Sequence, residues 1–374
     1  MQLVRVLFLV IVAALAACAP RGAITVVPSA ASVGTTRTVF VGTTRASDAE
    51  NGDLFGFPRS PETRFARFDV SVPPERKPGK IVWPKPHQAP DPATEFLTTR
   101  EDLFETEGDF RAELARALRT EPSGEREAIV FVHGFNNTFA EGLYRVAQLG
   151  HDLELSGVSV HYSWPSRANP LGYAYDRDSA LFARDGLQDL LNEVSAAGAD
   201  SIILVAHSMG SALTMETLRQ IAIADDRRVL PKVAGVILIS PDIDVDVFKA
   251  QAARMGKLPQ PFIIFTSSKD RALQLSARLT GQRDRLGNLE DIEEIADLDV
   301  TLLDVSAFSE GLGHFAVGDS PLLLRILGRM TDLDASFAAD PTGRTGLLPG
   351  VVLTVQNATE IVLSPVAAIG GAAQ

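Results

Sequence analysis

The chain has one cysteine, no excess of basic charge and no apolar run long enough to span a membrane. The single thiol, that of Cys18, excludes a disulfide within the chain. Acidic residues outnumber basic ones, 47 against 35, and the net charge of -12 argues against nucleic acid as a partner. With 45% hydrophobic and 22% charged residues, the chain is globular and long enough for one large or two ordinary domains.

Metal-binding and nucleotide-binding motifs are missing as well. The sequence has no H-E-x-x-H, no paired C-x-x-C and no glycine-rich phosphate loop. Metal-dependent hydrolysis and nucleotide chemistry therefore have no support from motifs. The alternating acids Asp242, Asp244 and Asp246 lack the glycine of a calcium-binding EF-hand loop. We expect neither a metal ion nor an organic cofactor.

The N-terminus has the layout of an export signal. Residues 1–5 carry one basic side chain, and residues 6–15 are an uninterrupted apolar run. The run ends in Leu-Ala-Ala-Cys, which resembles the lipobox of bacterial lipoproteins. The resemblance implies cleavage before Cys18, a diacylglycerol on its thiol and anchorage in a membrane. Because Ala19 follows, the resemblance favours the outer membrane on its periplasmic side.

Composition and periodicity divide the rest of the chain. We predict a signal peptide at 1–17, a tether at 18–36, a folded domain at 37–335 with a core at 128–335, and a tail at 336–374. Before the core, at 37–127, we expect two antiparallel strands at 37–43 and 65–72, a proline-rich surface loop at 73–92 and a helix at 109–119.

The core alternates between buried strands and amphipathic helices. The strands are predicted at 128–132, 158–162, 201–205, 233–239, 261–266 and 299–305. Apolar side chains at helical spacing lie between them, at 139–153, 180–194 and 212–221. This order predicts an α/β fold with a mostly parallel, doubly wound sheet. The apolar segment 351–366 is either a further strand or a disordered end.

A serine between small residues follows the third core strand. Ser208 is the centre of Ala-His-Ser-Met-Gly at 206–210, between an apolar strand and a helical run. This pattern is the G-x-S-x-G nucleophile elbow with Ala206 in place of the first glycine. The small flanks are needed because the serine main chain is strained at such a turn. Its position in the chain favours a nucleophile over an ordinary turn or helix cap.

One histidine has the position of a catalytic base. In a chain ordered serine, acid, histidine, the base follows the last core strand, and among the six histidines His314 alone does so. For the acid, both Asp270 and Asp242 follow strands whose carboxyl ends form one edge of the sheet. We favour Asp270, because it follows the strand just before the histidine strand. The losing aspartate would be a helix N-cap.

Two main-chain N–H groups are candidates for binding an oxyanion. One belongs to Met209, directly after the serine. The other belongs to Phe135, in the loop after the first core strand, where Gly134 permits unusual main-chain angles.

Several segments together resemble the DUF900-type α/β-hydrolases of bacteria. They are Val-Phe-Val-Gly-Thr-Thr-Arg at 39–45, Val-Phe-Val-His-Gly-Phe-Asn-Asn-Thr at 130–138, Tyr-Ser-Trp-Pro-Ser at 162–166, the serine pentapeptide, Ser-Pro-Asp-Ile-Asp at 240–244 and Ser-Ser-Lys-Asp-Arg-Ala-Leu at 267–273. The resemblance covers about 38–317 and implies an α/β-hydrolase fold, with Ser208 as nucleophile and His314 as base. It leaves the acid open between Asp242 and Asp270.

The sequence therefore predicts a serine hydrolase that acts on a small-molecule carboxylic ester through an acyl-enzyme. The alternative is a lipid-anchored binding or assembly protein on an inactive hydrolase fold. Only about 20 residues connect the strands that end at Ile239 and begin at Pro261, a place where many lipases insert a lid. We expect little or no lid and an open site for short or medium acyl chains.

Overall fold

The structure is a computed structural model of the chain. It describes residues 21–48, 54–121, 125–281, 284–308, 350–355 and 358–363, and the single residues 314, 318, 320, 321 and 324. None of the helices in these ranges is both long enough and apolar enough to span a bilayer. The predicted signal peptide and Cys18 lie outside the described residues.

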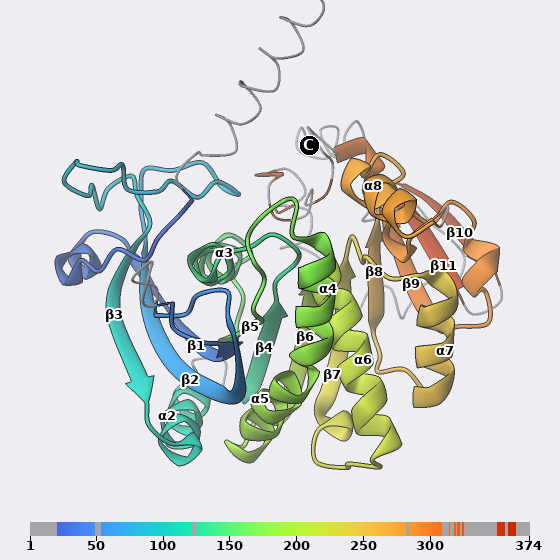
Figure 1. The fold of residues 1–374 in the computed structure, drawn as a ribbon, viewed down its shortest axis with the longest axis horizontal. Coiled ribbons are helices and arrows are strands. Elements are labelled where there is room, and N and C mark those ends of the chain that lie inside the picture. The colour runs from blue at the N-terminus through green and yellow to red at the C-terminus, as the bar shows by residue number, and fades with distance from the viewer. Residues whose placement is uncertain are drawn as a thin grey trace, which may run out of the picture.

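A mixed sheet of 11 strands passes through the described part of the chain (Figure 1), in the order β10-β11-β9-β8-β7-β6-β4-β5-β1-β2-β3. The strands are β1 (Thr35–Arg45), β2 (Arg59–Val72), β3 (Leu97–Phe104), β4 (Glu127–Val132), β5 (Val158–Ser163), β6 (Ser201–His207), β7 (Val233–Ile239), β8 (Phe262–Thr266), β9 (Val300–Asp304), β10 (Gly350–Val355) and β11 (Ala358–Leu363). Only the pairs β1–β2, β2–β3 and β10–β11 are antiparallel. The predicted mostly parallel sheet with antiparallel N-terminal strands is confirmed.

Helices cover both faces of the sheet. They are α2 (Glu107–Arg119), α3 (Phe139–Asp152), α4 (Tyr173–Phe182), α5 (Arg184–Ala196), α6 (Met209–Ile223), α7 (Val245–Met255) and α8 (Arg271–Leu279), with short 3₁₀ turns at Pro28–Ser32, Leu230–Lys232, Leu286–Asn288, Ile292–Ile295 and Ser306–Phe308. In β4, Val130 and Val132 pack with α5 and α6, whereas Phe131 packs with α3 on the other face. This alternation follows from the pleat of a strand, and Figure 1 shows α4 to α7 together on one side.

The N-terminal part contains one strand that the sequence analysis missed. The predicted strands pair antiparallel as β1 and β2, and residues 73–92 form neither helix nor strand, as expected. The missed strand, β3, carries Arg100, Glu101 and Asp102 in its middle. It is the edge strand of the sheet, where charged side chains are common because they discourage pairing with another chain. These charged residues interrupt the apolar pattern that is typical of a strand, so β3 was not predicted.

Part of the segment predicted as a tether, 18–36, packs on the domain. Val27 N–H donates to the Thr98 carbonyl at 2.7 Å, and Thr98 N–H donates to the Thr25 carbonyl at 2.9 Å. Ala30 is completely buried. The residues around Val26 therefore pair with the outer edge of β3, which offers unpaired main-chain groups, and this part of the segment is not a free spacer.

Three other segments bear on the site. The single helix expected at 180–194 is two helices, α4 and α5, which meet at Ala183, whose carbonyl accepts a hydrogen bond from the Tyr162 hydroxyl at 2.6 Å. The apolar C-terminal segment forms strands, since β11 pairs with β9. The connection between β7 and β8 holds one helix, α7.

Candidate functional site

The predicted site residues come together at one edge of the parallel sheet. Ser208 follows β6, Asp242 follows β7, Asp270 follows β8, and His314 comes after β9 in the chain. Because β6, β7, β8 and β9 are parallel, their carboxyl ends meet at the same edge. Ligand sites of open α/β sheets form at such edges.

Ser208 has an unusual main-chain conformation. Its φ of 53° and ψ of -122° lie in a region that non-glycine residues rarely adopt. Its N–H donates to the Ile239 carbonyl at 2.9 Å, and its carbonyl accepts from the Asp242 N–H at 3.2 Å. Such strain costs about 1–3 kcal/mol and persists only where the surroundings hold it. The end of β7 therefore helps to fix the turn that carries the serine.

Close packing around the turn explains which small residues are required. A Cβ on Gly210 would lie 2.3 Å from the His133 carbonyl oxygen, and one on Gly134 would lie 2.9 Å from the Ser208 Cβ. Both positions therefore need glycine. Ala206 is completely buried within the sheet, so a methyl group is accommodated where the motif usually has its first glycine.

Three of the predicted residues form a continuous hydrogen-bonded chain. His314 Nε2 lies 2.9 Å from Ser208 Oγ, and His314 Nδ1 lies 2.8 Å from Asp270 Oδ2. Asp270 is completely buried, and its other oxygen accepts from the Leu273 N–H at 3.0 Å, at the start of α8. A proton on Nδ1, facing the carboxylate, leaves Nε2 free to accept the serine proton.

The competing aspartate has different partners. Asp242 accepts hydrogen bonds from the Ser276 hydroxyl at 2.6 Å and the Tyr173 hydroxyl at 2.9 Å. Its Oδ1 also lies 3.2 Å from Arg285 Nε, in an ion pair whose side chains are 6% and 4% exposed. Burial, together with the nearby Asp242 charge, raises the pKa of Tyr173. The Asp242 carboxylate therefore belongs to a second polar cluster beside the serine.

The helix-capping role expected of the losing aspartate falls to other residues. Asp244 caps α7 by accepting from the Val247 N–H at 3.0 Å, and Asp270 itself caps α8. Within the ranges that the structure covers, no group of three or more His, Cys, Asp or Glu side chains is arranged to hold a metal ion.

The loop after β4 carries Phe135, one of the two predicted oxyanion donors. The Asn137 side-chain amide donates to the Gly134 carbonyl at 3.2 Å and to the Phe135 carbonyl at 2.9 Å. Both carbonyls are thus held by the loop itself. The main-chain N–H groups of Phe135 and Met209 donate to no acceptor in the described part of the chain. Two donors near Ser208 are therefore available for a ligand.

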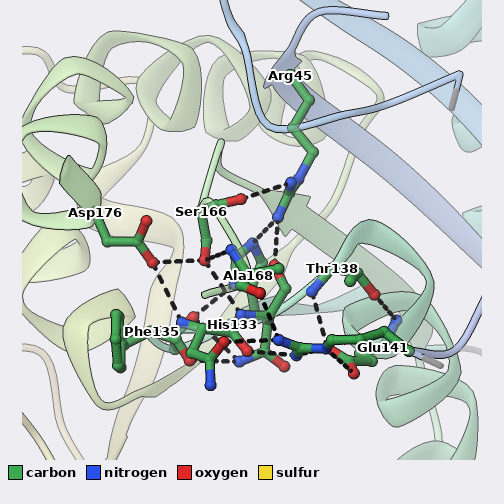
Figure 2. Close-up of polar contacts among 12 residues, drawn as sticks. Arg45, His133, Phe135, Thr138, Glu141, Ser166, Ala168 and Asp176 are labelled. Carbon is green, nitrogen blue, oxygen red and sulfur yellow. Dashed lines mark hydrogen bonds and ion pairs between the residues drawn. The ribbon is translucent and has the colours of Figure 1, made fainter. Parts of the chain in front are cut away.

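A buried aspartate holds this loop from the side (Figure 2). Asp176 Oδ2 accepts from the Asn136 N–H at 3.2 Å and from the Ser166 hydroxyl at 2.6 Å, and Oδ1 accepts from the Arg167 N–H at 2.7 Å. Asp176 is completely buried, and burial raises the pKa of its carboxyl group. Every one of these donors belongs to the loop or to the segment after β5.

A buried arginine also holds this loop (Figure 2). Arg45, at the end of β1, is 1% exposed and donates to the Asn137 carbonyl at 2.9 Å and to Ser163 Oγ at 2.9 Å. The His133 ring stacks on Trp164 with 4.8 Å between ring centroids. Burial, with the adjacent charge of Arg45, keeps the pKa of His133 well below its usual range.

No sequence pattern predicts a role for Arg45 or Asp176. Arg45 ends one of the segments that carry the family resemblance, and this was the only sign of its importance. Asp176 lies outside those segments. The histidine beside the serine is a further support, since His207 Nε2 lies 3.3 Å from the His314 carbonyl oxygen and the two rings are 4.9 Å apart. Burial keeps the pKa of His207 well below its usual range.

Two solved structures are similar to parts of this chain. They are lipase B of Aspergillus fumigatus (14% identity, TM-score 0.36, 58% of this chain and 56% of the lipase covered) and a hyperthermophilic esterase of the archaeon Pyrobaculum calidifontis (13% identity, TM-score 0.34, 63% and 95% covered). The chain thus spans little more than half of the lipase. A search of curated proteins finds no match.

A family model covers more than half of the sequence. The model of the alpha/beta hydrolases of unknown function, DUF900, matches residues 106–329. This range holds the serine turn, both aspartates, His314 and the loop after β4. The chain therefore belongs to the DUF900 family of alpha/beta hydrolases.

Proposed function

We propose that the protein is a serine hydrolase that cleaves carboxylic esters through a Ser-His-Asp triad. The observation that carries the proposal is the hydrogen-bonded chain from Ser208 Oγ through His314 to Asp270, with distances of 2.9 and 2.8 Å. A serine in ordinary structural use needs neither a strained main chain nor an imidazole paired with a buried carboxylate.

The mechanism follows from this geometry. His314 Nε2 takes the proton of Ser208 as Oγ attacks the ester carbonyl carbon. The N–H groups of Phe135 and Met209 stabilise the negative charge that develops on the carbonyl oxygen. Asp270 keeps the Nδ1 proton in place and stabilises the imidazolium that forms.

The tetrahedral intermediate that results breaks down to an acyl-enzyme, which is hydrolysed in a second stage. The alcohol leaves with the proton held by His314, and an acyl group remains on Ser208. Water, deprotonated by His314, attacks the acyl-enzyme carbonyl, and the carboxylic acid leaves as His314 returns the proton to Ser208 Oγ. The single helix between β7 and β8 supports an open site for short or medium acyl chains. Marked interfacial activation on lipid emulsions would contradict that expectation.

Turnover of p-nitrophenyl esters tests the proposal. Ser208→Ala should lower kcat by on the order of 10⁴-fold or more, because the nucleophile is lost. Ser211→Ala is a matched control, since it removes a buried hydroxyl from the first turn of the same helix. Equal rates of ester hydrolysis by wild type and Ser208→Ala would contradict the proposal and favour a binding or assembly protein.

We also propose that the protein is exported and anchored through Cys18 to a membrane, on the periplasmic side of the outer membrane. The support is the sequence Leu-Ala-Ala-Cys after an apolar run. Arg21, three residues further on, donates to the Asn136 carbonyl at 2.6 Å and pairs with Glu141. An extended chain spans at most about 3.6 Å per residue, so such an anchor would lie close to the loop after β4.

Membrane fractionation tests the anchor. Wild type should sediment with membranes and take up radiolabelled fatty acid, and Cys18→Ser should do neither. Release of the unmodified wild-type protein into the soluble fraction would contradict the anchor and would leave the proposed ester hydrolysis unaffected.

A further inference from the structure

An arginine near the start of the described chain contacts the loop that carries Phe135. The Arg21 side chain is 33% exposed, and a guanidinium group has five N–H donors. Nη1 donates to Asn136 Oδ1 and to the Ala168 carbonyl, both at 2.7 Å, and Nη2 donates to the Asn136 carbonyl at 2.6 Å. Nε donates to Glu141 Oε1 at 2.9 Å, and Nη2 also pairs with Glu141 Oε2. All five donors of Arg21 therefore have an acceptor.

These acceptors belong to three separate segments of the chain. Asn136 is in the loop after β4, Glu141 is in the first turn of α3, and Ala168 follows β5. Figure 2 shows Glu141 and Ala168 beside the loop that carries Phe135. The Glu141 carboxylate also accepts from the Thr138 N–H at 2.9 Å and so caps α3. Arg21 therefore ties the loop to the start of a helix and to the segment after β5.

Two of the residues that Arg21 contacts have a strained main chain. Asn136 has a φ of 59° and Ala168 a φ of 54°, both in the left-handed region that favours glycine. A residue with a side chain keeps such a conformation only where its surroundings hold it. The carbonyl groups of both residues accept hydrogen bonds from Arg21. The guanidinium group therefore stabilises both turns.

The strained turn at Asn136 directly follows the proposed oxyanion donor. An oxyanion donor acts only when it lies about 3 Å from the developing charge, and the direction of the Phe135 N–H depends on the peptide units beside it. The Asn136 N–H donates to Asp176 at 3.2 Å, and the Asn136 carbonyl accepts from Arg21. Arg21 and Asp176 thus hold the two peptide units that follow Phe135.

The N-terminal segment that carries Arg21 is itself held on α3. Gly22 lies so close to Trp83 that a Cβ at this position would overlap the indole ring. Trp83 in turn stacks on Tyr144 of α3, with 4.8 Å between the ring centroids. Arg21 lies outside residues 106–329, which match the family model, so family membership assigns it no role.

We infer that Arg21 is a positioning residue for ester hydrolysis, which holds the turn at Asn136 so that the Phe135 N–H faces the oxyanion. The inference rests on the proposed hydrolase function. A partly exposed ion pair adds little to the stability of a fold, whereas small displacements of a catalytic group slow a reaction strongly. Loss of the guanidinium group should therefore lower kcat and leave ester binding and folding nearly unchanged.

Arg21→Met in the full chain tests the inference, because methionine keeps an apolar side chain and removes all five donors. With p-nitrophenyl butyrate, kcat should fall about tenfold, less than the 10²–10³-fold typical of losing an oxyanion donor outright. KM should change less than about twofold, and the midpoint of thermal unfolding by no more than about 4 °C. Arg227→Met is the matched control, since Arg227 is an 84% exposed arginine in a surface ion pair, and it should keep the wild-type kcat.

A trifluoromethyl ketone with the same acyl chain separates positioning from a general loss of structure. Its adduct with Ser208 carries an oxyanion like that of the transition state, so its affinity should fall in Arg21→Met by about the factor lost in kcat/KM. Competition with a fluorophosphonate for Ser208 measures this affinity.

The outcomes that contradict the inference differ from those that contradict the hydrolase. A wild-type kcat in Arg21→Met, an unchanged affinity for the ketone, or a loss of kcat that matches a loss of folded protein overturns the inference alone. A wild-type protein that hydrolyses no ester, with Ser208 unreactive toward the fluorophosphonate, overturns the proposed hydrolase itself.

Discussion

Two buried aspartates at the ends of neighbouring strands have opposite surroundings. Asp270, after β8, faces an imidazole whose other nitrogen contacts Ser208. Asp242, after β7, faces a guanidinium group and two hydroxyl groups. The position after a strand is therefore not what distinguishes the acid of the proposed triad from the other aspartate. The side chain that faces the carboxylate is what distinguishes it.

The difference has a local cause. The Asp270 carboxylate is fixed by its own helix, since Oδ1 caps α8 and Oδ2 remains for His314. The Asp242 main chain is used to hold the Ser208 turn, and its carboxylate is turned toward Ser276 on α8. Asp270 is thus placed to orient the His314 ring, and Asp242 holds the main chain around Ser208.

Among the substitutions that test this difference, Asp270→Asn should have the largest effect. An amide in place of the carboxylate favours the wrong histidine tautomer, so kcat should fall by on the order of 10⁴-fold. The measurement is kcat for a p-nitrophenyl ester, with thermal unfolding to confirm a folded variant. A loss of less than about tenfold would remove Asp270 from the triad.

Asp242→Asn should act on stability instead. Removing one partner of a buried ion pair leaves the Arg285 charge uncompensated, which typically costs about 3–5 kcal/mol. Urea unfolding should show this loss, while the folded fraction keeps a kcat well above that of Asp270→Asn. If Asp242→Asn instead lost kcat as severely as Asp270→Asn with no change in stability, the two assignments would be reversed.

A third buried aspartate sharpens the contrast, because the Asp176 carboxylate accepts hydrogen bonds from the loop that presents Phe135 and from the segment after β5. Asp176→Asn replaces an acceptor with a donor that faces other donors, which should shift the loop. A misplaced oxyanion donor should lower kcat by up to about 10²-fold, with less change in KM. Asp185→Asn, on an exposed side chain of α5, is the matched control. An unchanged kcat in Asp176→Asn would show that the loop is fixed without it.

The smallest effect concerns a histidine that has no part in the triad. Burial lowers the pKa of His161 from 6.5 to about 3, so the folded protein keeps this ring neutral while the unfolded chain binds a proton. Its contribution to stability is complete above about pH 6.5 and is lost as the pH falls toward 3. At pH 5 the loss is about 2 kcal/mol.

Urea unfolding at pH 7.5 and pH 5 measures this loss in the free energy of unfolding. His161→Gln should reduce the pH dependence by about 2 kcal/mol. An identical pH dependence in wild type and His161→Gln would contradict the assignment of the buried neutral ring.

The fold could be predicted from the sequence where burial fixes the pattern. Strands buried on both faces are continuous apolar runs, so the six core strands were predicted within a few residues. Edge elements were harder, because β3 is polar and pairs on one side only. The helix break at Ala183 has no glycine or proline to mark it.

The site was predictable in its chain order and less so in its partners. Strand ends and the serine turn identify Ser208 and His314 as neighbours. The choice between Asp242 and Asp270 depends on Tyr173, Ser276 and Arg285, which no local pattern links to either strand. Arg45 and Asp176 are equally hard to predict, since a buried charge is recognised by contacts between segments far apart in the sequence.

The most direct test of a catalytic Ser208 is its reaction with a fluorophosphonate, followed by mass spectrometry to map the adduct. Only a serine activated by a base reacts at an appreciable rate. We predict a single adduct on Ser208, formed at the wild-type rate in Asp242→Asn and much more slowly in Asp270→Asn. An unlabelled protein, or an adduct on another residue, would contradict the proposed triad.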